Sequence, residues 1–143
     1  MNERVCWPAI AACFVVVGCA APGGPSTKDI SSDCAGAFCE IDVFAECDGN
    51  ACAASADKKI LRVRDRGAIV IQWKLRTGQD FRFADGGVRF GSGAPFECNP
   101  VQADRITCVD HNQGAGTYEY KLDVVRSGSP PTTIPVDPWV VNK

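Results

Sequence analysis

Cysteine and histidine are the residue types of this chain whose side chains could bind a metal, form a covalent bond or act as a catalytic base. Nine cysteines are present, and His111 is the single histidine. Paired cysteines could hold zinc or form disulfides, and a lone cysteine could carry a covalent group. An imidazole could act as a general base beside a carboxylate. Which of these chemistries applies depends on the compartment and on the elements that position the side chains.

The first nineteen residues have the pattern of an export signal. Arg4 precedes an uncharged apolar stretch of about 14 residues, which is too short to span a membrane as a helix. The closing residues Val16-Val17-Gly18-Cys19 resemble a bacterial lipoprotein signal, in which cleavage before the cysteine leaves its thiol to carry diacylglycerol. We therefore expect residues 1–18 to be a signal peptide and Cys19 to be the lipidated residue.

Two other interpretations of this segment stay open. One is a plain secretory signal cleaved near Ala20 and Ala21, and the other is an uncleaved N-terminal membrane anchor. Under the lipoprotein resemblance, an alanine after the cysteine implies sorting to the outer membrane of a Gram-negative bacterium. Several acyl chains, at about 0.8 kcal/mol per buried methylene, would make the attachment nearly permanent. The expected partner of the N-terminus is therefore the membrane.

The cysteines beyond the signal favour disulfides over metal binding. They are Cys34, Cys39, Cys47, Cys52, Cys98 and Cys108. An exported chain meets an oxidising environment, where an even number of cysteines indicates disulfide bonds. Zinc is the alternative, because two pairs share a symmetrical Cys-x4-Cys spacing, but zinc pairs are usually tighter and the compartment favours oxidation. We expect no metal and no other cofactor.

Local spacing suggests how these cysteines pair. The predicted pairs are Cys98 with Cys108 around Asn99-Pro100, Cys47 with Cys52 around Asp48-Gly49-Asn50 and, by elimination, Cys34 with Cys39. An exchange of partners among the first four, such as Cys39 with Cys52, stays open. Closing a loop of about ten residues contributes on the order of 2–3 kcal/mol through the unfolded state.

Alternating apolar residues predict an all-β fold. The clearest strand is residues 68–75, whose apolar residues share one face: Ile69, Ile71, Trp73 and Leu75. Residues 41–45 alternate in the same way, and further strands are expected at 59–64, 81–83, 88–90, 94–98, 105–109 and 117–125. Turns such as Asp85-Gly86-Gly87 separate them. Because no long amphipathic helix is present, we predict an antiparallel β-sandwich of about seven to nine short strands.

Composition divides the mature chain into three parts. Residues 19–33 are expected to be the lipidated cysteine with a flexible Pro/Gly/Ser linker, residues 34–127 the sandwich, and residues 128–143 a proline-rich tail. Since proline lacks a backbone donor, the tail is predicted to lie extended on the surface outside any central strand. Trp139 could dock back onto the sheet, which we favour, or stay exposed as an anchor for a partner.

Two aromatic positions favour an immunoglobulin-like sandwich. Trp73 lies mid-strand, where such domains place a buried tryptophan, and Gly116-Thr117-Tyr118 resembles the tyrosine corner, whose hydroxyl bonds to an upstream backbone group. Antibody domains have a cysteine two residues after that tyrosine, where this chain has Tyr120. Aromatic packing is therefore expected in place of the inter-sheet disulfide. The alternative is that Trp73 and Tyr118 are ordinary core aromatics of another sandwich.

The segment from about Cys39 to Val125 also resembles a family of small bacterial Ig-like proteins. The matching motifs are Val70-Ile71-Gln72-Trp73-Lys74-Leu75, the Phe81 and Phe83 pair before Gly86-Gly87-Val88, and Asp110-His111-Asn112 leading to Gly116-Thr117-Tyr118-Glu119-Tyr120. These motifs are structural. The resemblance therefore implies an Ig-like fold and brings no activity or ligand with it.

Signals for catalysis are sparse. A Ser-His-Asp arrangement would have to use His111, which lies in a turn beside Asp110 without a nucleophile motif. Glycine-rich turns such as Gly91-Ser92-Gly93 lack the strand-to-helix context of a phosphate loop. The turn Asp48-Gly49-Asn50 lacks the further carboxylates that calcium requires. We therefore expect no enzymatic activity.

The charge balance narrows the partners. The chain has 15 Lys and Arg against 17 Asp and Glu, with the signs interspersed, so a nucleic acid is not expected. The favoured hypothesis is a non-enzymatic cell-envelope lipoprotein, a structural accessory or a module whose loops at 76–80 or 110–116 bind a protein or glycan. The alternative is a small envelope hydrolase that uses His111 with a nearby carboxylate.

Overall fold

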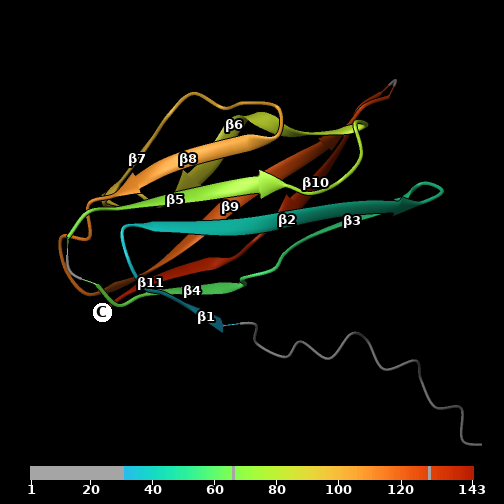
Figure 1. Cartoon of the computed structure of the whole chain (residues 1–143). Helices are drawn as coiled ribbons and strands as arrows, with labels where there is room; N and C mark the ends of the chain where they lie inside the picture. The colour runs from blue at the N-terminus through green and yellow to red at the C-terminus, as the bar shows by residue number, and fades with distance from the viewer. Residues whose placement is uncertain (1–30, 66, 129) are drawn as a thin grey trace, which may run out of the picture.

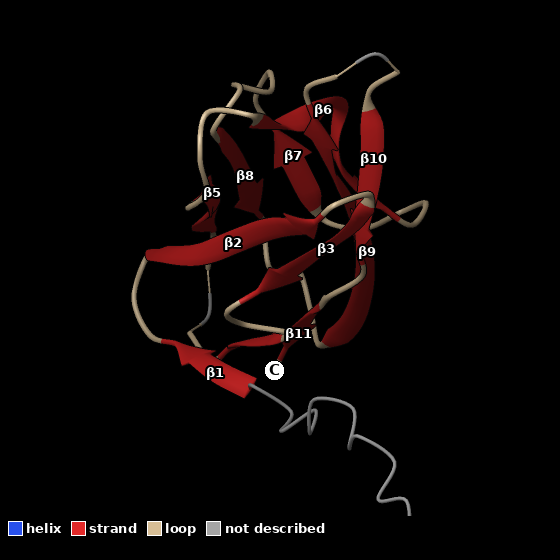
Figure 2. Cartoon of the chain, turned by 90° about the vertical axis from the view of Figure 1, so that its right-hand side faces the viewer, coloured by secondary structure: helices blue, strands red, loops and turns tan. Residues whose placement is uncertain are grey.

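Strands and their connecting loops make up the described part of the chain. The computed structural model describes residues 31–65, 67–128 and 130–143, so the predicted signal peptide and Cys19 lie outside it. Within these residues the chain forms eleven strands in two sheets and no helix (Figures 1 and 2). The prediction of an all-β fold is confirmed.

The first sheet is built around β9, its longest strand. Its members are β1 (Ser31–Cys34), β4 (Ile60–Val63), β6 (Phe81–Phe90), β9 (Gly116–Arg126), β10 (Thr132–Val136) and β11 (Trp139–Asn142). The order across the sheet is β1–β4–β11–β9. Strands β10 and β11 follow one another along one edge of β9 in a single register, because Val136 pairs with Leu122 and Trp139 with Glu119. Strand β6 lies on the opposite edge of β9.

The second sheet has the order β3–β2–β5–β8–β7. Its strands are β2 (Phe38–Asp48), β3 (Ala51–Ala56), β5 (Ile69–Leu75), β7 (Phe96–Cys98) and β8 (Arg105–Asp110). Figure 1 shows β2, β5 and β8 running side by side in one layer.

The two sheets are mixed, so the prediction of a purely antiparallel sandwich is wrong. Strand β4 pairs in parallel with both β1 and β11, and β2 pairs in parallel with β5. The reason is that these neighbours are not hairpin partners. The connections from β1 to β2 and from β4 to β5 cross from one sheet to the other, and crossing connections do not impose the antiparallel direction of a tight hairpin.

The core between the sheets has the residues that the alternation predicts. All four apolar residues of the 69–75 face are buried, as are Ile41, Val43 and Ala45 of β2. The largest fully buried side chains are Trp73, Tyr120 and Phe83. Burying a large apolar side chain contributes about 1.5–3 kcal/mol, so this layer is the main source of stability.

Strand β6 corrects the prediction of two short strands separated by a turn. Residues 81–83 and 88–90 both pair with β9, and the register shifts between Phe83 and Val88. The segment Asp85-Gly86-Gly87 is therefore part of a bulge within one strand. Gly87 has a φ of 58°, which glycine adopts without the steric penalty of a side chain.

The proline-rich tail corrects a second prediction. Instead of lying outside the sheet, residues 132–142 supply β10 and β11, and β11 is an interior strand between β4 and β9. The docking alternative for the tail is thus the one observed. Pro135 is exposed on β10, whose outer edge has no paired strand among the described residues, and Pro138 falls in the break between the two strands. Neither proline therefore removes a backbone N–H that would pair with a neighbouring strand.

The sandwich also begins earlier than predicted. Strand β1 starts at Ser31, within residues 19–33 that composition assigns to the linker, and pairs with β4. The sequence Ser31-Ser32-Asp33-Cys34 has no apolar alternation. Its strand conformation comes from pairing with a strand about thirty residues away, which periodicity cannot reveal.

Candidate functional site

The two loops that the sequence offers for binding lie at opposite ends of the sandwich. Asp110 pairs with Ile69 at the start of β5, whereas Arg76 directly follows Leu75 at the end of β5. The length of β5 separates these ends by roughly 20 Å. We call them the His111 end and the Arg76 end. The two loops are therefore separate candidate sites.

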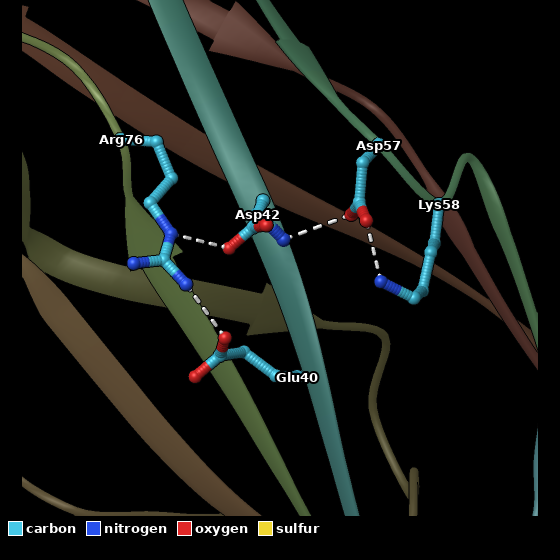
Figure 3. A network of polar contacts seen from close by, with 5 residues as sticks. All are labelled: Glu40, Asp42, Asp57, Lys58 and Arg76. Atoms are coloured by element: carbon cyan, nitrogen blue, oxygen red, sulfur yellow. Dashed lines mark hydrogen bonds and ion pairs between the residues drawn. The ribbon is translucent and has the colours of Figure 1, made fainter.

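The side chain of Arg76 is engaged in a polar network. Its Nε donates to Asp42 Oδ1 (2.7 Å) and its Nη2 to Glu40 Oε1 (2.8 Å), so the guanidinium bridges two carboxylates of β2 (Figure 3). Asp57 accepts the backbone N–H of Asp42 (2.8 Å) and contacts Lys58. The hydrogen bond to Asp42 raises the pKa of Arg76 above its ordinary value. These contacts anchor the chain after β5, which supports a structural role for Arg76.

The His111 end gathers four loops and the C-terminus. The loops join β1 to β2, β4 to β5, β6 to β7 and β8 to β9. Backbone hydrogen bonds of 2.8 Å tie these loops to neighbouring segments, from Val70 N–H to Ala37 O and from His111 N–H to Pro95 O. A hollow of about 370 Å³ lies here, lined by residues 112–115 and Lys143. At this end, several loops could therefore contact one ligand.

Asp110 and Asn142 are buried polar residues at this end. The Asp110 side chain is fully buried, and Oδ1 accepts hydrogen bonds from Asn112 N–H (2.8 Å) and from Asn142 Nδ2 (3.2 Å). Within the described part of the chain, Asp110 Oδ2 and Asn142 Oδ1 have no partner. Desolvation raises the pKa of the Asp110 carboxyl above its ordinary value. Asp110 thus links the β8–β9 loop to the C-terminal strand.

His111 lies outside this buried group. Its Nε2 is 3.4 Å from Glu97 Oε2, and both side chains are exposed, at 42% and 81%. The carboxylate beside the imidazole is therefore Glu97, while Asp110 points into the core. Among the described residues, no serine, threonine or cysteine side chain makes a hydrogen bond with the ring, and the six cysteines are in disulfides. The pair has the arrangement of solvated surface residues.

A groove runs along β9 beside the His111 end. Residues 89–94 form one wall and residues 117–119 with Lys121 form the other, enclosing about 460 Å³. Phe90 and Tyr118 line it, and Phe96 packs against both: its ring stacks on Phe90 with centroids 3.8 Å apart and meets Tyr118 edge-on at 5.3 Å. The sequence did not point to this groove, since Gly91-Ser92-Gly93 indicates only a turn and the pairing of distant aromatics is not readable from spacing.

The tyrosine assignment requires a correction. Trp73 Nε1 donates to Tyr120 Oη (2.8 Å) in the core, and the two rings meet edge-on at 5.3 Å. The aromatic packing expected at Tyr120 is confirmed. Tyr118, however, does not make the predicted bond to an upstream backbone group of the described chain. Its hydroxyl lies over Gly116, where a Cβ would come within 2.7 Å of it. Tyr118 and Tyr120 are two positions apart and therefore lie on the same face of β9. The buried Tyr120 is the one that makes a hydrogen bond, which it accepts from Trp73.

The three predicted disulfides are those of the structure. Cys47–Cys52 closes the β2–β3 hairpin and Cys98–Cys108 joins β7 to β8 in direct cross-strand register. Cys34–Cys39 joins the end of β1 to the start of β2, so it connects the two sheets. The alternative exchange of Cys39 with Cys52 is not observed.

Comparisons with known proteins add no family. The chain matches no model of a protein family and no curated protein. Among residues 31–65, 67–128 and 130–143, no group of three or more His, Cys, Asp or Glu side chains could hold a metal ion. The same residues contain no helix long and apolar enough to cross a membrane.

Proposed function

We propose that this chain is a non-enzymatic cell-envelope lipoprotein whose sandwich binds an envelope protein or glycan with its His111 end. One structural observation supports the place of binding. An aromatic-lined groove opens beside the loops of this end, whereas the hollow of about 630 Å³ at the other end is lined by Arg76, which Glu40 and Asp42 already engage.

The proposed tether comes from the sequence motif ending at Cys19. The three disulfides support an oxidising compartment, which is consistent with export. Acyl chains on Cys19 would hold the protein at a membrane, in our proposal the outer membrane of a Gram-negative bacterium. Intact mass spectrometry of the mature protein tests this part. A mature chain that begins at Cys19 and carries diacylglycerol is expected, and an unmodified Cys19 would contradict the tether.

We propose further that the sandwich is immunoglobulin-like. Two packed sheets with Trp73 buried against Tyr120 support this assignment. The parallel pairs β2–β5 and β1–β4 depart from the plain antiparallel pattern, so the assignment rests on the core and not on strand direction.

Binding and hydrolysis predict different effects of substitution at the His111 end. For a binding module, Gln113→Arg in the exposed loop abolishes complementation of a deletion strain, while His111→Ala retains it. The control Gln79→Arg places the same exposed charge at the Arg76 end and should complement fully. Loss of function in a folded His111→Ala protein, with Gln113→Arg active, would instead favour the hydrolase that pairs His111 with Glu97.

A further inference from the structure

We propose that the groove beside β9 receives an extended segment of another protein, which adds as a strand to the open edge of β9. This inference rests on the proposed function, because the groove belongs to the His111 end, and it names the class of ligand. The segment would pair with the stretch from Gly116 to Glu119.

The open edge arises because β6 is shorter than β9 on their shared side. Phe90, the last residue of β6, pairs with Tyr120. Strand β9 begins four residues earlier, at Gly116, while the chain after Phe90 turns away through Gly91-Ser92-Gly93. Along those four residues the described chain provides no strand on this side of β9.

Hydrogen bonds on the β11 side of β9 show in which direction the backbone groups of residues 116–119 point. Tyr120 N–H donates to Pro138 O (3.1 Å), so its backbone faces β10 and β11. Trp139 N–H donates to Lys59 O (2.8 Å), away from its partner Glu119. In an antiparallel ladder, alternate residues direct both N–H and C=O to the same side. The N–H and C=O of Thr117 and Glu119 therefore point into the groove.

These backbone groups specify an extended peptide. Two residues that are two positions apart present their donors and acceptors about 7 Å apart, which is the repeat of a partner strand. Within the described residues, no backbone hydrogen bond of the 91–94 turn reaches Thr117 or Glu119. Both residues are exposed. A strand added here would satisfy donors and acceptors that this sheet edge leaves without a partner strand, as in other cases of strand addition to a sheet edge.

The groove walls indicate the side chains of such a segment. On the core side, Tyr118 and Phe90 line the groove and Phe96 packs against both rings, so this wall suits apolar residues. On the outer side, Glu119 and Lys121 are exposed and make no ion pair within the described chain, so both charge signs are available to pair with the ligand. The segment is therefore expected to alternate apolar residues, facing the aromatics, with charged residues facing outward.

The test uses peptides selected without assuming a sequence. A display library of random octapeptides is selected against the full chain in detergent, and the most enriched peptide is synthesised as the probe. Enriched peptides should alternate apolar and charged residues, and the probe should slow hydrogen exchange at the Thr117 and Glu119 amides. Absence of enriched peptides, or protection confined to other strands, would overturn the inference.

A pair of variants at one position isolates the backbone donor. Thr117→Pro removes an N–H that points into the groove and leaves the hydrogen bonds between β9 and β11 intact. The residue before position 117 is Gly116, and glycine tolerates a following proline better than other residues do. We expect binding of the probe to weaken about tenfold or more. Thr117→Val keeps the N–H and should bind like the parent chain. Equal affinity of the proline variant would contradict strand addition.

The peptide provides a second measurement if Thr117→Pro does not fold. N-methylation of alternate amides of the probe removes the donors facing β9 in one register, whereas methylation of the other set leaves them in place. One set should abolish binding and the other should not, and equal effects of both sets would overturn the inference. A concentration-dependent dimer of this chain that Thr117→Pro abolishes would show a second copy as the occupant and would also overturn it.

The inference and the proposed function can fail separately. If Gln113→Arg abolishes complementation but Thr117→Pro leaves complementation and probe binding unchanged, strand addition is wrong and binding by the loops stands. If neither variant affects complementation, binding at the His111 end is itself wrong.

Discussion

At the scale of single residues, the core depends on a hydrogen bond between two aromatic side chains that are far apart in sequence. Trp73 Nε1–H has Tyr120 Oη as its partner, and both side chains are fully buried. Burial raises the pKa of the Tyr120 hydroxyl above its ordinary value, so the hydroxyl stays protonated. A buried donor without a partner is costly, which makes this pair a sensitive point of the fold.

Tyr120→Phe should therefore destabilise the protein through the indole N–H that it leaves unpaired. We expect the free energy of unfolding to fall by about 1–3 kcal/mol, measured by urea denaturation. Tyr118→Phe removes a hydroxyl that has no hydrogen-bond partner in the described chain, so its effect should stay within about 0.5 kcal/mol. Equal losses for the two variants would contradict the assigned hydrogen bond.

Asp110 predicts a pH dependence of stability. Its pKa in the folded state is raised by desolvation above the value of the unfolded chain. The folded state therefore holds the proton more tightly, and the stability from the neutral carboxyl is lost as pH rises through the folded-state pKa. Asp110→Asn remains neutral and keeps an acceptor for Asn112 N–H. The stability of this variant relative to the parent chain should thus rise between pH 4 and pH 8.

A matched variant separates this effect from general charge removal. Asp85 is a carboxylate with a 96% exposed side chain in the β6 bulge. Asp85→Asn should leave the stability difference from the parent chain nearly constant over the same pH range. If Asp110→Asn behaves in the same way, the buried carboxyl does not set the pH dependence.

At the scale of elements, the β6 bulge keeps both halves of β6 paired with β9 across a shift in register. The bulge requires glycine at one position. Gly87 has a φ of 58°, and a Cβ there would lie 2.7 Å from Val101 Cγ2. The neighbouring Gly86 has ordinary backbone geometry and would contact only the flexible end of Arg89.

Gly87→Ala should therefore destabilise the protein by about 1–3 kcal/mol, because it combines backbone strain with a steric clash. Gly86→Ala should have a clearly smaller effect. Thermal or urea unfolding of the two variants measures the difference. A Gly87→Ala protein as stable as Gly86→Ala would show that the bulge does not depend on this glycine.

Local sequence signals predict elements whose partners are near in sequence. The alternation of residues 69–75 and the cysteines around Gly49 depend on neighbours within one strand or hairpin, so both were predictable. Strand β1 and the docking of the tail depend on pairing with β4 and β9, which no local pattern encodes. The bulge was missed for a related reason, since a glycine-rich segment looks the same in a turn and in a bulged strand.

At the scale of the whole molecule, the crossing connections between sheets place the candidate site. They bring four loops to one end of the sandwich and leave the edge of β9 open there, whereas the sequence alone offered two loops of equal rank. Residues 20–30 join Cys19 to the first strand and could span at most roughly 40 Å. In the proposed lipoprotein, the binding end would therefore act close to the membrane.

The central claim is that the His111 end contacts a partner in the envelope. A photo-crosslinking residue placed at Gln113 in the full chain, expressed in intact cells, measures this contact directly, with the same residue at Asp80 as the control at the Arg76 end. We predict a discrete crosslinked product from Gln113 and none from Asp80. A product from Asp80 alone, or no product from either position, would contradict the account.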